Sequence, residues 1–349
     1  MKINQRHYGV LFTLAAAMFF GTGAIIIKLA YRIDISSWDF LTLQYICSCA
    51  MLLPIYYLNR WRSGGAPVPR KVLGRLALQG VVGSFGGSIF LFLGFQYVGA
   101  AVGTVLFYSY PAFVTLGAIL FFKEKAGLSQ YSCLAITFLG TILTIDFWTV
   151  SVANTPAQGV GLIMVSALCY TFFSLYGQRN LSDSSSLEIT TFTQLFAFLA
   201  CIIVKPPLFL LEGISYYALF LGFVMALFTS VCSYFLLLKG MSLIGASKAS
   251  IISTFEIPFT IILALIILGE RLAFWQFLGA ALIVGSIIYL DLAENKTEPK
   301  GGGPDGIPEE SPEGPCSGDK HHIILEDHEF EDDCHRMQYA KRGSNAGCP

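Results

Sequence analysis

The chain alternates long apolar runs with short polar segments, and this pattern predicts membrane-spanning helices. The runs are about 18 to 25 residues long, which lets a helix cross the hydrocarbon core of a bilayer, and they lack the alternation of a lipid-facing barrel strand. We therefore expect an all-α polytopic membrane protein. Ten spans are predicted, at residues 9–30, 39–58, 76–97, 102–122, 128–148, 159–178, 188–204, 216–238, 249–268 and 274–293.

The second half of the chain repeats the first. Residues 94–146 align without a gap onto residues 240–292, with nine identical positions that include Glu124 opposite Glu270. Each copy lies in a half with five predicted spans, and because five is odd, the second half should enter the bilayer from the opposite side. Such inverted repeats are typical of transporters. The predicted organisation is two inverted five-helix repeats followed by a tail, at residues 1–148, 149–294 and 295–349.

Composition agrees with a membrane as the solvent of this chain. Hydrophobic residues make up 54% and charged residues only 13% of the sequence, and the mean hydropathy is +0.64. A soluble domain could not keep so many apolar runs out of water. The first run has no small-residue cleavage site after it and is needed by the repeat, so we interpret it as a retained span. The cysteines show no disulfide framework.

The net charge of -1 hides two opposed parts of the chain. Residues 1–294 hold 16 Lys and Arg against 11 Asp and Glu, whereas residues 295–349 hold 6 against 12. The acidic tail is rich in Pro and Gly and poor in apolar groups, so we expect it to be disordered.

Basic residues between the spans predict the orientation of the protein. Twelve lie on the side of the N-terminus and three lie opposite, so the positive-inside rule places both termini in the cytoplasm of a cell whose plasma or inner membrane holds the protein. The twelve are Lys2, Arg6, Arg60, Arg62, Arg70, Lys71, Arg75, Lys123, Lys125, Arg179, Lys239 and Lys248, and the three are Arg32, Lys205 and Arg271.

Glu256 is the only carboxylate well inside a predicted span. An ionised side chain near the midplane costs at least about 2.5 to 3.5 kcal/mol, so it must be neutral, paired with a cation, or open to a water-filled cavity. Each of these makes Glu256 a candidate substrate or proton site. The alternative is a buried Glu that only hydrogen-bonds a neighbouring helix.

Tyr110 occupies the position of Glu256 in the first repeat, so symmetry predicts that the two residues lie across the pseudo-twofold axis, where repeat-built transporters bind their substrates. Pro111 and Pro258 follow them and each removes a backbone hydrogen bond, which favours a bend with free carbonyls at the cavity; an ordinary tolerated proline is the alternative.

Several hydroxyls extend this candidate pathway. Ser253 and Thr260 share a helical face with Glu256. In the fourth span the polar stripe of Thr104, Tyr108 and Thr115 is rotated away from Tyr110, so the two repeats disagree about which helical face borders a water-filled cavity. Helix packing is the alternative role of such hydroxyls. Lys28 and Lys248 lie near span ends, where they either snorkel to the interface or reach the cavity. The residues of the predicted substrate or proton pathway are Glu256, Tyr110, Tyr108, Ser253, Thr260, Tyr170, Tyr234 and Lys248.

The tail also contains groups that can ligate transition metals, but their spacing matches no defined finger. A solvated acidic tail is the favoured interpretation, with metal binding as the alternative. The residues concerned are His321, His322, His328, Cys334 and His335.

The runs GASKASIISTFEIPFTIILALIILGERL and GAAVGTVLFYSYPAFVTLGAILFFKEK resemble the signature halves of the drug/metabolite transporter superfamily, in its ten-helix EamA-like branch. The resemblance covers residues 9 to 293. It implies that each half is one EamA domain, that spans four and nine border a central cavity, and that small metabolites move by alternating access, often outward. By resemblance Glu256 holds the acidic position before the proline of the ninth helix, and Glu270 ends that helix.

Together these features predict a secondary transporter that exports or exchanges a small polar metabolite, such as an amino acid, with Glu256 as a protonatable gate. One alternative is exchange of phosphorylated or nucleotide-linked metabolites, which needs cavity cations; another is a membrane scaffold or sensor that signals through its tail. No HExxH, GxSxG or GxxxxGK[ST] pattern occurs, so we expect neither an enzyme nor a cofactor. The expected partners are a small-molecule substrate, lipid and protons, but no nucleic acid, and a homodimer stays open.

Overall fold

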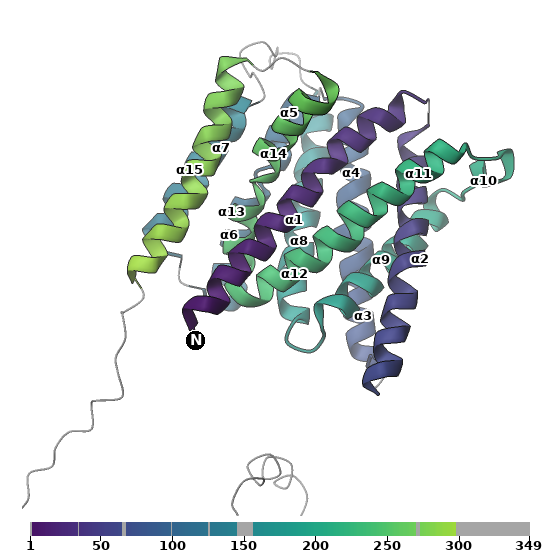
Figure 1. Cartoon of the computed structure of the whole chain (residues 1–349), viewed down its shortest axis with the longest axis horizontal. Coiled ribbons are helices and arrows are strands. Elements are labelled where there is room, and N and C mark those ends of the chain that lie inside the picture. The colour runs from purple at the N-terminus through teal and green to yellow at the C-terminus, as the bar shows by residue number, and fades with distance from the viewer. Residues whose placement is uncertain are drawn as a thin grey trace, which may run out of the picture. The chain divides into compact units, whose positions relative to one another are not determined.

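A computed structural model gives the fold of this protein, and it describes residues 2–33, 35–64, 68–98, 100–124, 126–144, 156–269 and 273–297. Within these residues the secondary structure is entirely helical. Figure 1 shows a bundle of long helices, with α7 and α15 at one edge and α2 and α9 toward the other. The predicted acidic tail at 295–349 and its metal candidates lie almost entirely outside the described residues.

The first half contributes five spans to the bundle, some of them made of consecutive helical segments. Their segments are α1 (Lys2–Tyr31), α2 (Ser37–Ser63), α3 (Arg70–Leu78) continuing through the π-helical η1 (Gln79–Phe85) into α4 (Gly86–Phe95), α5 (Ala100–Phe107) with α6 (Tyr110–Phe122), and α7 (Leu128–Thr144).

The second half has the same order of spans. Its segments are α8 (Ala157–Asn180), α9 (Ser186–Val204), the short α10 (Phe209–Glu212), α11 (Tyr216–Met225) continuing through the π-helical η4 (Ala226–Cys232) into α12 (Ser233–Ile244), α13 (Ala246–Ser253) with α14 (Glu256–Leu263) and η5 (Ala264–Leu268), and α15 (Phe274–Thr297). The short α10 and the π-helical η5 are additional segments. A π-helical segment therefore interrupts the third span of each half.

The predicted spans are confirmed as helices. Among the described residues, nine helices are long and apolar enough to cross a membrane, and the fifth span is present as the shorter apolar helix Leu128–Thr144. Side chains on the outside of the bundle are apolar: Phe121, Ile203 and Ile266 are 75%, 80% and 72% exposed. Such a surface is stable against lipid and unstable against water, so the helical unit is a polytopic membrane bundle.

Local sequence explains where several helices begin. The hydroxyl of Ser36 accepts a hydrogen bond from the backbone N–H of Asp39 at the start of α2, and that of Ser215 accepts one from Ala218 at the start of α11. Ser185 and Glu188 form a reciprocal capping box at the start of α9. These side chains satisfy backbone donors that the first turn of a helix leaves without partners.

The two halves pack against each other with twofold pseudosymmetry. The glycine contact between α1 and α12, Gly9 against Gly240, is matched between α8 and α4 by Gly159 against Gly94. Likewise Ser233 donates a hydrogen bond to the Ala16 carbonyl, and Ser166 donates one to the Gly87 carbonyl. Each first span thus packs on the third span of the other half, and the equivalent residues of the first spans are 150 positions apart.

The symmetry axis inverts one half relative to the other. The fifth and tenth spans, α7 and α15, are equivalent helices in close contact. Gly140 meets Gly279, whereas the thiol of Cys133, earlier in α7, donates a hydrogen bond to the carbonyl of Ser286, later in α15, at 3.2 Å. The order of contacts is opposite along the two helices, so they are antiparallel, as an inverted repeat requires.

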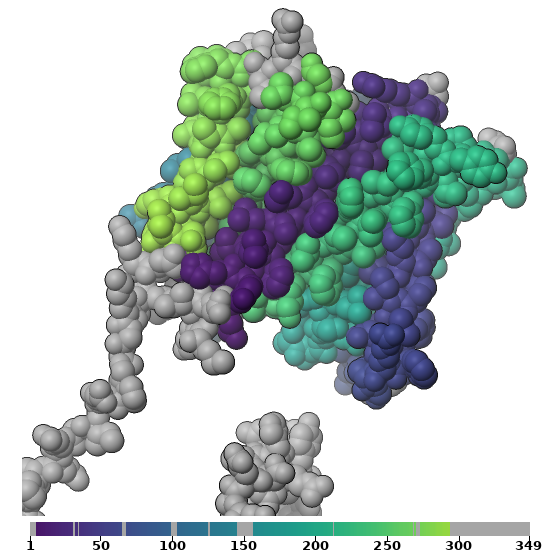
Figure 2. Space-filling view, viewed as in Figure 1, coloured from purple at the N-terminus to yellow at the C-terminus, as the bar shows by residue number. Residues whose placement is uncertain are grey.

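Both ends of the helical unit lie on one face, which we call the proximal face. There the Arg6 guanidinium donates to the Asp291 carboxylate at 3.3 Å and to the Asp291 carbonyl at 2.9 Å, so α1 begins beside the end of α15 (Figure 1). We call the opposite face, on which α1 ends and α2 begins, the distal face. In the space-filling view of Figure 2, α1 crosses the visible side of the bundle between α11–α12 and α13–α15.

Candidate functional site

A cavity of about 480 Å³ lies at the centre of the bundle, between the two halves. It is bordered by residues of α1, α2, η1, α4, α5, α6, α7, α8, α9, α11, η4, α12 and α14. The residues that α1 contributes, from Phe20 to Ile27, lie near its distal end, and those of α2, from Leu41 to Tyr45, lie near its distal start. The cavity therefore extends from the middle of the bundle toward the distal face.

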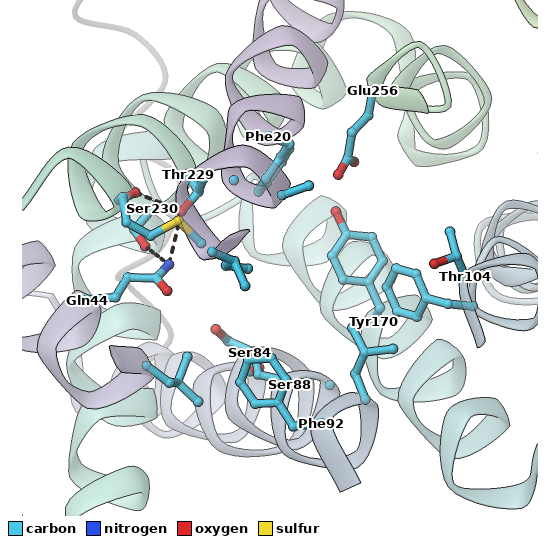
Figure 3. A pocket seen from close by; sticks show the side chains of 18 of the residues that line it. Phe20, Gln44, Ser84, Ser88, Phe92, Thr104, Tyr170, Thr229, Ser230 and Glu256 are labelled. Atoms are coloured by element: carbon cyan, nitrogen blue, oxygen red, sulfur yellow. Dashed lines mark hydrogen bonds between the residues drawn. The ribbon is translucent and has the colours of Figure 1, made fainter. Parts of the chain in front are cut away.

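Glu256 is held in this cavity by an interruption in the ninth span. Residues Thr254 and Phe255 form a turn between α13 and α14, in which each backbone N–H donates to the carbonyl three residues earlier, of Ile251 and Ile252 respectively. Glu256 is the first residue of α14, and Pro258 follows two residues later. The turn interrupts the helical periodicity and so changes the direction in which the side chains after it project. The Glu256 carboxyl therefore points into the cavity, as Figure 3 shows.

The fourth span is interrupted at the equivalent position. Tyr108 and Ser109 form a turn between α5 and α6, and Pro111 lies in the first turn of α6. Tyr108 and Tyr110 consequently both border the cavity, although a continuous helix would place them far apart around its axis. The sequence left open which face of this span borders the cavity, and the turn brings both tyrosines to it.

Tyrosines surround the carboxyl. The Tyr108 phenol lies beside the Glu256 carboxyl at the cavity. In Figure 3 the Tyr170 hydroxyl points across the cavity toward the same carboxyl. The rings form a connected wall, with centroids 5.9 Å apart between Tyr108 and Tyr110 and 4.7 Å apart between Tyr110 and Tyr170. Tyr234 continues the wall and packs on Phe20, with centroids 5.3 Å apart.

The wall away from Glu256 carries neutral polar groups. The amide nitrogen of Gln44 donates to the hydroxyls of Thr229 and Ser230, at 3.0 and 2.8 Å (Figure 3). Gln194 also borders the cavity, and its amide oxygen is buried without a hydrogen-bond partner in the described part of the chain. Among the described lining residues, Glu256 is the only Asp, Glu, Lys, Arg or His.

Most of the predicted pathway residues meet at this cavity, but two do not. Glu256, Tyr108, Tyr110, Tyr170, Tyr234 and Thr260 line it. Ser253 is buried in α13, where its hydroxyl donates to the Ala249 carbonyl, and Lys248 lies near the proximal start of α13, so neither borders the cavity. Lys28 does not border it either.

Two functional candidates, Gln44 and Gln194, were not predicted. They are the same position of the repeat, because the first and second spans of the two halves correspond at an offset of 150 residues. The sequence therefore did contain a signal for these two residues, because a Gln recurs at the same position of two apolar spans. The alignment of residues 94–146 with 240–292 missed it because it begins after the second span.

The proximal side of the cavity is closed by a three-residue bridge between the halves. The Gln178 amide nitrogen donates to the Glu124 carboxylate at 2.7 Å, and its amide oxygen accepts a hydrogen bond from the backbone N–H of Ala246. Glu124 follows α6 of the first half, whereas Gln178 and Ala246 belong to α8 and α13 of the second. Between this bridge and the cavity lie the fully buried side chains of Val114 and Ala249.

No group of three or more potential metal ligands occurs in the part of the chain that the structure describes. The five tail residues that we considered as metal ligands lie beyond that part.

Comparison with known proteins identifies the family. The sequence profile of the EamA-like transporter family matches residues 7–146 and, a second time, residues 157–290. The chain belongs to the EamA-like transporter family. The expected membership of the EamA-like branch of the drug/metabolite transporter superfamily is thereby confirmed, and the two matches fall one on each half of the chain.

Relatives of this EamA-like protein are themselves described only as transporters. An uncharacterized transporter of Synechocystis sp. is 25% identical over 314 residues, which cover 82% of this chain and 94% of the relative. The uncharacterized inner membrane transporter YicL of Salmonella typhimurium is 23% identical over 81% of this chain and 95% of its own length. A crystal structure superimposes with a TM-score of 0.69 and 15% identity, covering 82% of this chain and 98% of the other, which supports the fold.

The family and the relatives together establish the coarse function. The protein is a multi-pass membrane transporter, with a small molecule as its substrate and the bilayer as its surroundings. The names of the family and relatives indicate a transporter and not an enzyme.

Proposed function

We propose that this protein is a secondary transporter that moves a small polar metabolite, an amino acid or a similar compound, by alternating access. The observation that carries the proposal is a central cavity between two inverted halves, which extends toward the distal face and holds one carboxyl. Repeat-built transporters place substrate and coupling-ion sites at such a midplane interface.

The bridge at the proximal face supports alternating access. Gln178 ties Glu124 of the first half to the start of α13 in the second half, so the proximal end of the cavity is closed while the distal side is hollow. In the other state this bridge would break and the distal ends of the helices would close. The substrate would then exchange with the proximal side.

We further propose that the proximal face is cytoplasmic, that Glu256 is the proton-coupling residue, and that transport is outward. The orientation rests on the predicted positive-inside bias. The proton role rests on the position of Glu256, which is the only Asp, Glu, Lys, Arg or His among the described lining residues and keeps part of its surface open to the cavity. With this orientation, the described conformation is the one that releases substrate outside the cell.

The cavity gives little support to the exchange of phosphorylated metabolites. Phosphate recognition uses Arg or Lys, and the described lining contains neither. A sensor that signals through the tail predicts that deletion of residues 299–349 abolishes its output. A transporter should keep its transport, because residues 1–298 form a compact unit of their own.

Transport in proteoliposomes tests the proposal. A thermal-shift screen of the purified protein against amino acids, amines, nucleosides and sugars identifies a stabilising ligand, because a ligand stabilises the folded form that it binds. Counterflow of that ligand into liposomes preloaded with the unlabelled compound should then exceed that of empty liposomes. Absence of counterflow for every stabilising ligand would contradict the transport function.

The variant Glu256→Gln separates proton coupling from transport itself. If Glu256 exchanges protons, an inwardly directed proton gradient should drive uphill movement in the wild type but not in the variant, while exchange without a gradient continues in the variant. Glu188→Gln is the matched control, since it removes a carboxylate from a helix cap outside the cavity. Equal gradient-driven transport in wild type and Glu256→Gln would remove the proton role.

A further inference from the structure

The charges around the cavity restrict what it binds. Glu256 is the only acidic residue of the described lining, and no Lys, Arg or His borders the cavity there. An anion or the carboxylate of an amino acid would therefore enter without a compensating charge and next to a carboxyl group, which is strongly unfavourable away from water. A cation, by contrast, compensates the ionised Glu256.

The groups beside Glu256 suit an ammonium in particular. Its carboxyl oxygens and the phenol oxygen of Tyr170, which points toward them, are hydrogen-bond acceptors for N–H donors (Figure 3). The rings of Tyr108, Tyr110 and Tyr170 lie next to one another, and their electron-rich surfaces attract a cation within about 6 Å of a ring centroid. Acceptors and rings thus converge at one end of the cavity.

The remaining lining indicates the rest of the ligand. Beyond the tyrosines the cavity is bordered by the neutral polar groups already described and by apolar side chains, which include Ile27, Leu91, Phe92 and Phe95. These side chains favour an apolar body, and about 480 Å³ is within the range of pockets that enclose small organic ligands.

We propose that the cavity binds a monocationic amine with an apolar body, whose ammonium lies between the Glu256 carboxylate and the rings of Tyr108, Tyr110 and Tyr170. This inference rests on the proposed transport function and narrows its substrate class. Amines without a carboxylate are favoured over the corresponding zwitterionic amino acids, because the described cavity offers no partner for the second charge.

Binding of two matched series tests this charge selection. The full-length protein in lipid nanodiscs is titrated calorimetrically at neutral pH with 2-phenylethylamine, phenylalanine, 2-phenylethanol and 3-phenylpropionate, and then with hexylamine, norleucine, hexanol and hexanoate. Empty nanodiscs correct for partition into lipid. We expect the amine of at least one series to bind at least about tenfold more tightly than its three analogues, as desolvated charge pairing predicts. A zwitterion, alcohol or acid that binds as tightly as its amine, or no binding by either amine, would overturn the proposal.

Variants test the position of the ammonium. Glu256→Gln should weaken amine binding about 30-fold or more, because it removes the opposite charge. Tyr170→Leu should weaken it about tenfold through loss of the ring, and Tyr170→Phe should weaken it less. Glu188→Gln, outside the cavity, should bind as the wild type. Thermal unfolding confirms that each variant is folded; folded Glu256→Gln with wild-type amine affinity would refute the assignment.

Transport measurements keep the two proposals distinguishable. If the amine binds but neither it nor any other stabilising ligand shows counterflow in liposomes, the transport function fails and the binding site stands. If an amino acid shows counterflow while neither amine binds, the transport function stands and the amine inference fails.

Discussion

The bridge at the proximal face makes a quantitative prediction about conformational balance. Glu124→Ala removes the acceptor of the 2.7 Å hydrogen bond from Gln178, which in turn holds the backbone N–H of Ala246. These helices keep other contacts: the Ser247 hydroxyl donates to the Thr115 hydroxyl at 2.9 Å, and side chains such as Val114 and Ala249 pack in the buried core. We therefore expect the variant to fold but to open more readily at the proximal end of the cavity.

The size of the effect follows from the nature of the bond. A hydrogen bond to a charged group contributes about 1.5 to 3 kcal/mol, and we take about 1.5 kcal/mol because Glu124 is partly exposed and water replaces part of the interaction. If the bridge forms only in the described conformation, its loss changes the ratio of the two conformations about tenfold.

Hydrogen–deuterium exchange of the protein in nanodiscs, read by mass spectrometry, measures this shift. Peptides that contain the start of α13 should exchange about tenfold faster in Glu124→Ala than in the wild type, because the Ala246 amide loses its fixed acceptor. Gln178→Ala should have a similar effect, and the double variant should add little to either, since both residues belong to one bridge. Glu188→Gln, which removes a carboxylate from a helix cap, should leave α13 unchanged. Unchanged exchange at α13 in a folded Glu124→Ala protein would refute the bridge as a closing element.

Three further predictions concern stability. Gly279→Ala should lower the thermal unfolding temperature, at a cost of about 1 to 3 kcal/mol of stability, because its Cβ would lie 2.5 Å from a backbone oxygen of α7. In the control Gly285→Ala, in the same helix, the new Cβ meets nothing within 4 Å and should not destabilise the protein. Equal losses of stability in the two variants would contradict the close packing. Asp183→Asn should lower the unfolding temperature slightly at neutral pH, because the hydrogen bond from Arg75 lowers the pKa of Asp183 below its ordinary 3.8. The stabilisation from this pair is present above pH 3.8 and is lost as the pH falls through the folded-state pKa. The unfolding temperatures of the variant and the wild type, measured across this range, should therefore converge at low pH. Gln194→Leu should stabilise the fold by up to about 1 kcal/mol and so raise the unfolding temperature, because the buried amide oxygen has no hydrogen-bond partner among the described residues. The same variant should weaken ligand binding. Calorimetric unfolding and a ligand titration measure the two effects, and a lower unfolding temperature would show that this amide oxygen is hydrogen-bonded.

The sequence alone located the helices and much of the site. A span must cover the hydrocarbon core with apolar residues, so length and hydropathy suffice to find it, and the observed helices coincide with the ten predicted runs where they are described. Glu256 was equally visible, because a carboxylate in an apolar span is costly and rare. Its repeat partner Tyr110 followed from the alignment, and both residues line the same cavity.

Only the tertiary structure decided which polar side chains meet in that cavity. Helical periodicity placed Ser253 on the same face as Glu256 and placed Tyr110 on a different face from Tyr108. The turns at Thr254 and Tyr108 interrupt that periodicity. As a result the Ser253 hydroxyl bonds to a carbonyl of its own helix, and both tyrosines border the cavity. Gln44 and Gln194 reach it from spans that the sequence does not order in space. Hydrophobicity is read locally along a chain, whereas the lining of a cavity depends on breaks in helix geometry and on contacts between distant segments, which no single span encodes.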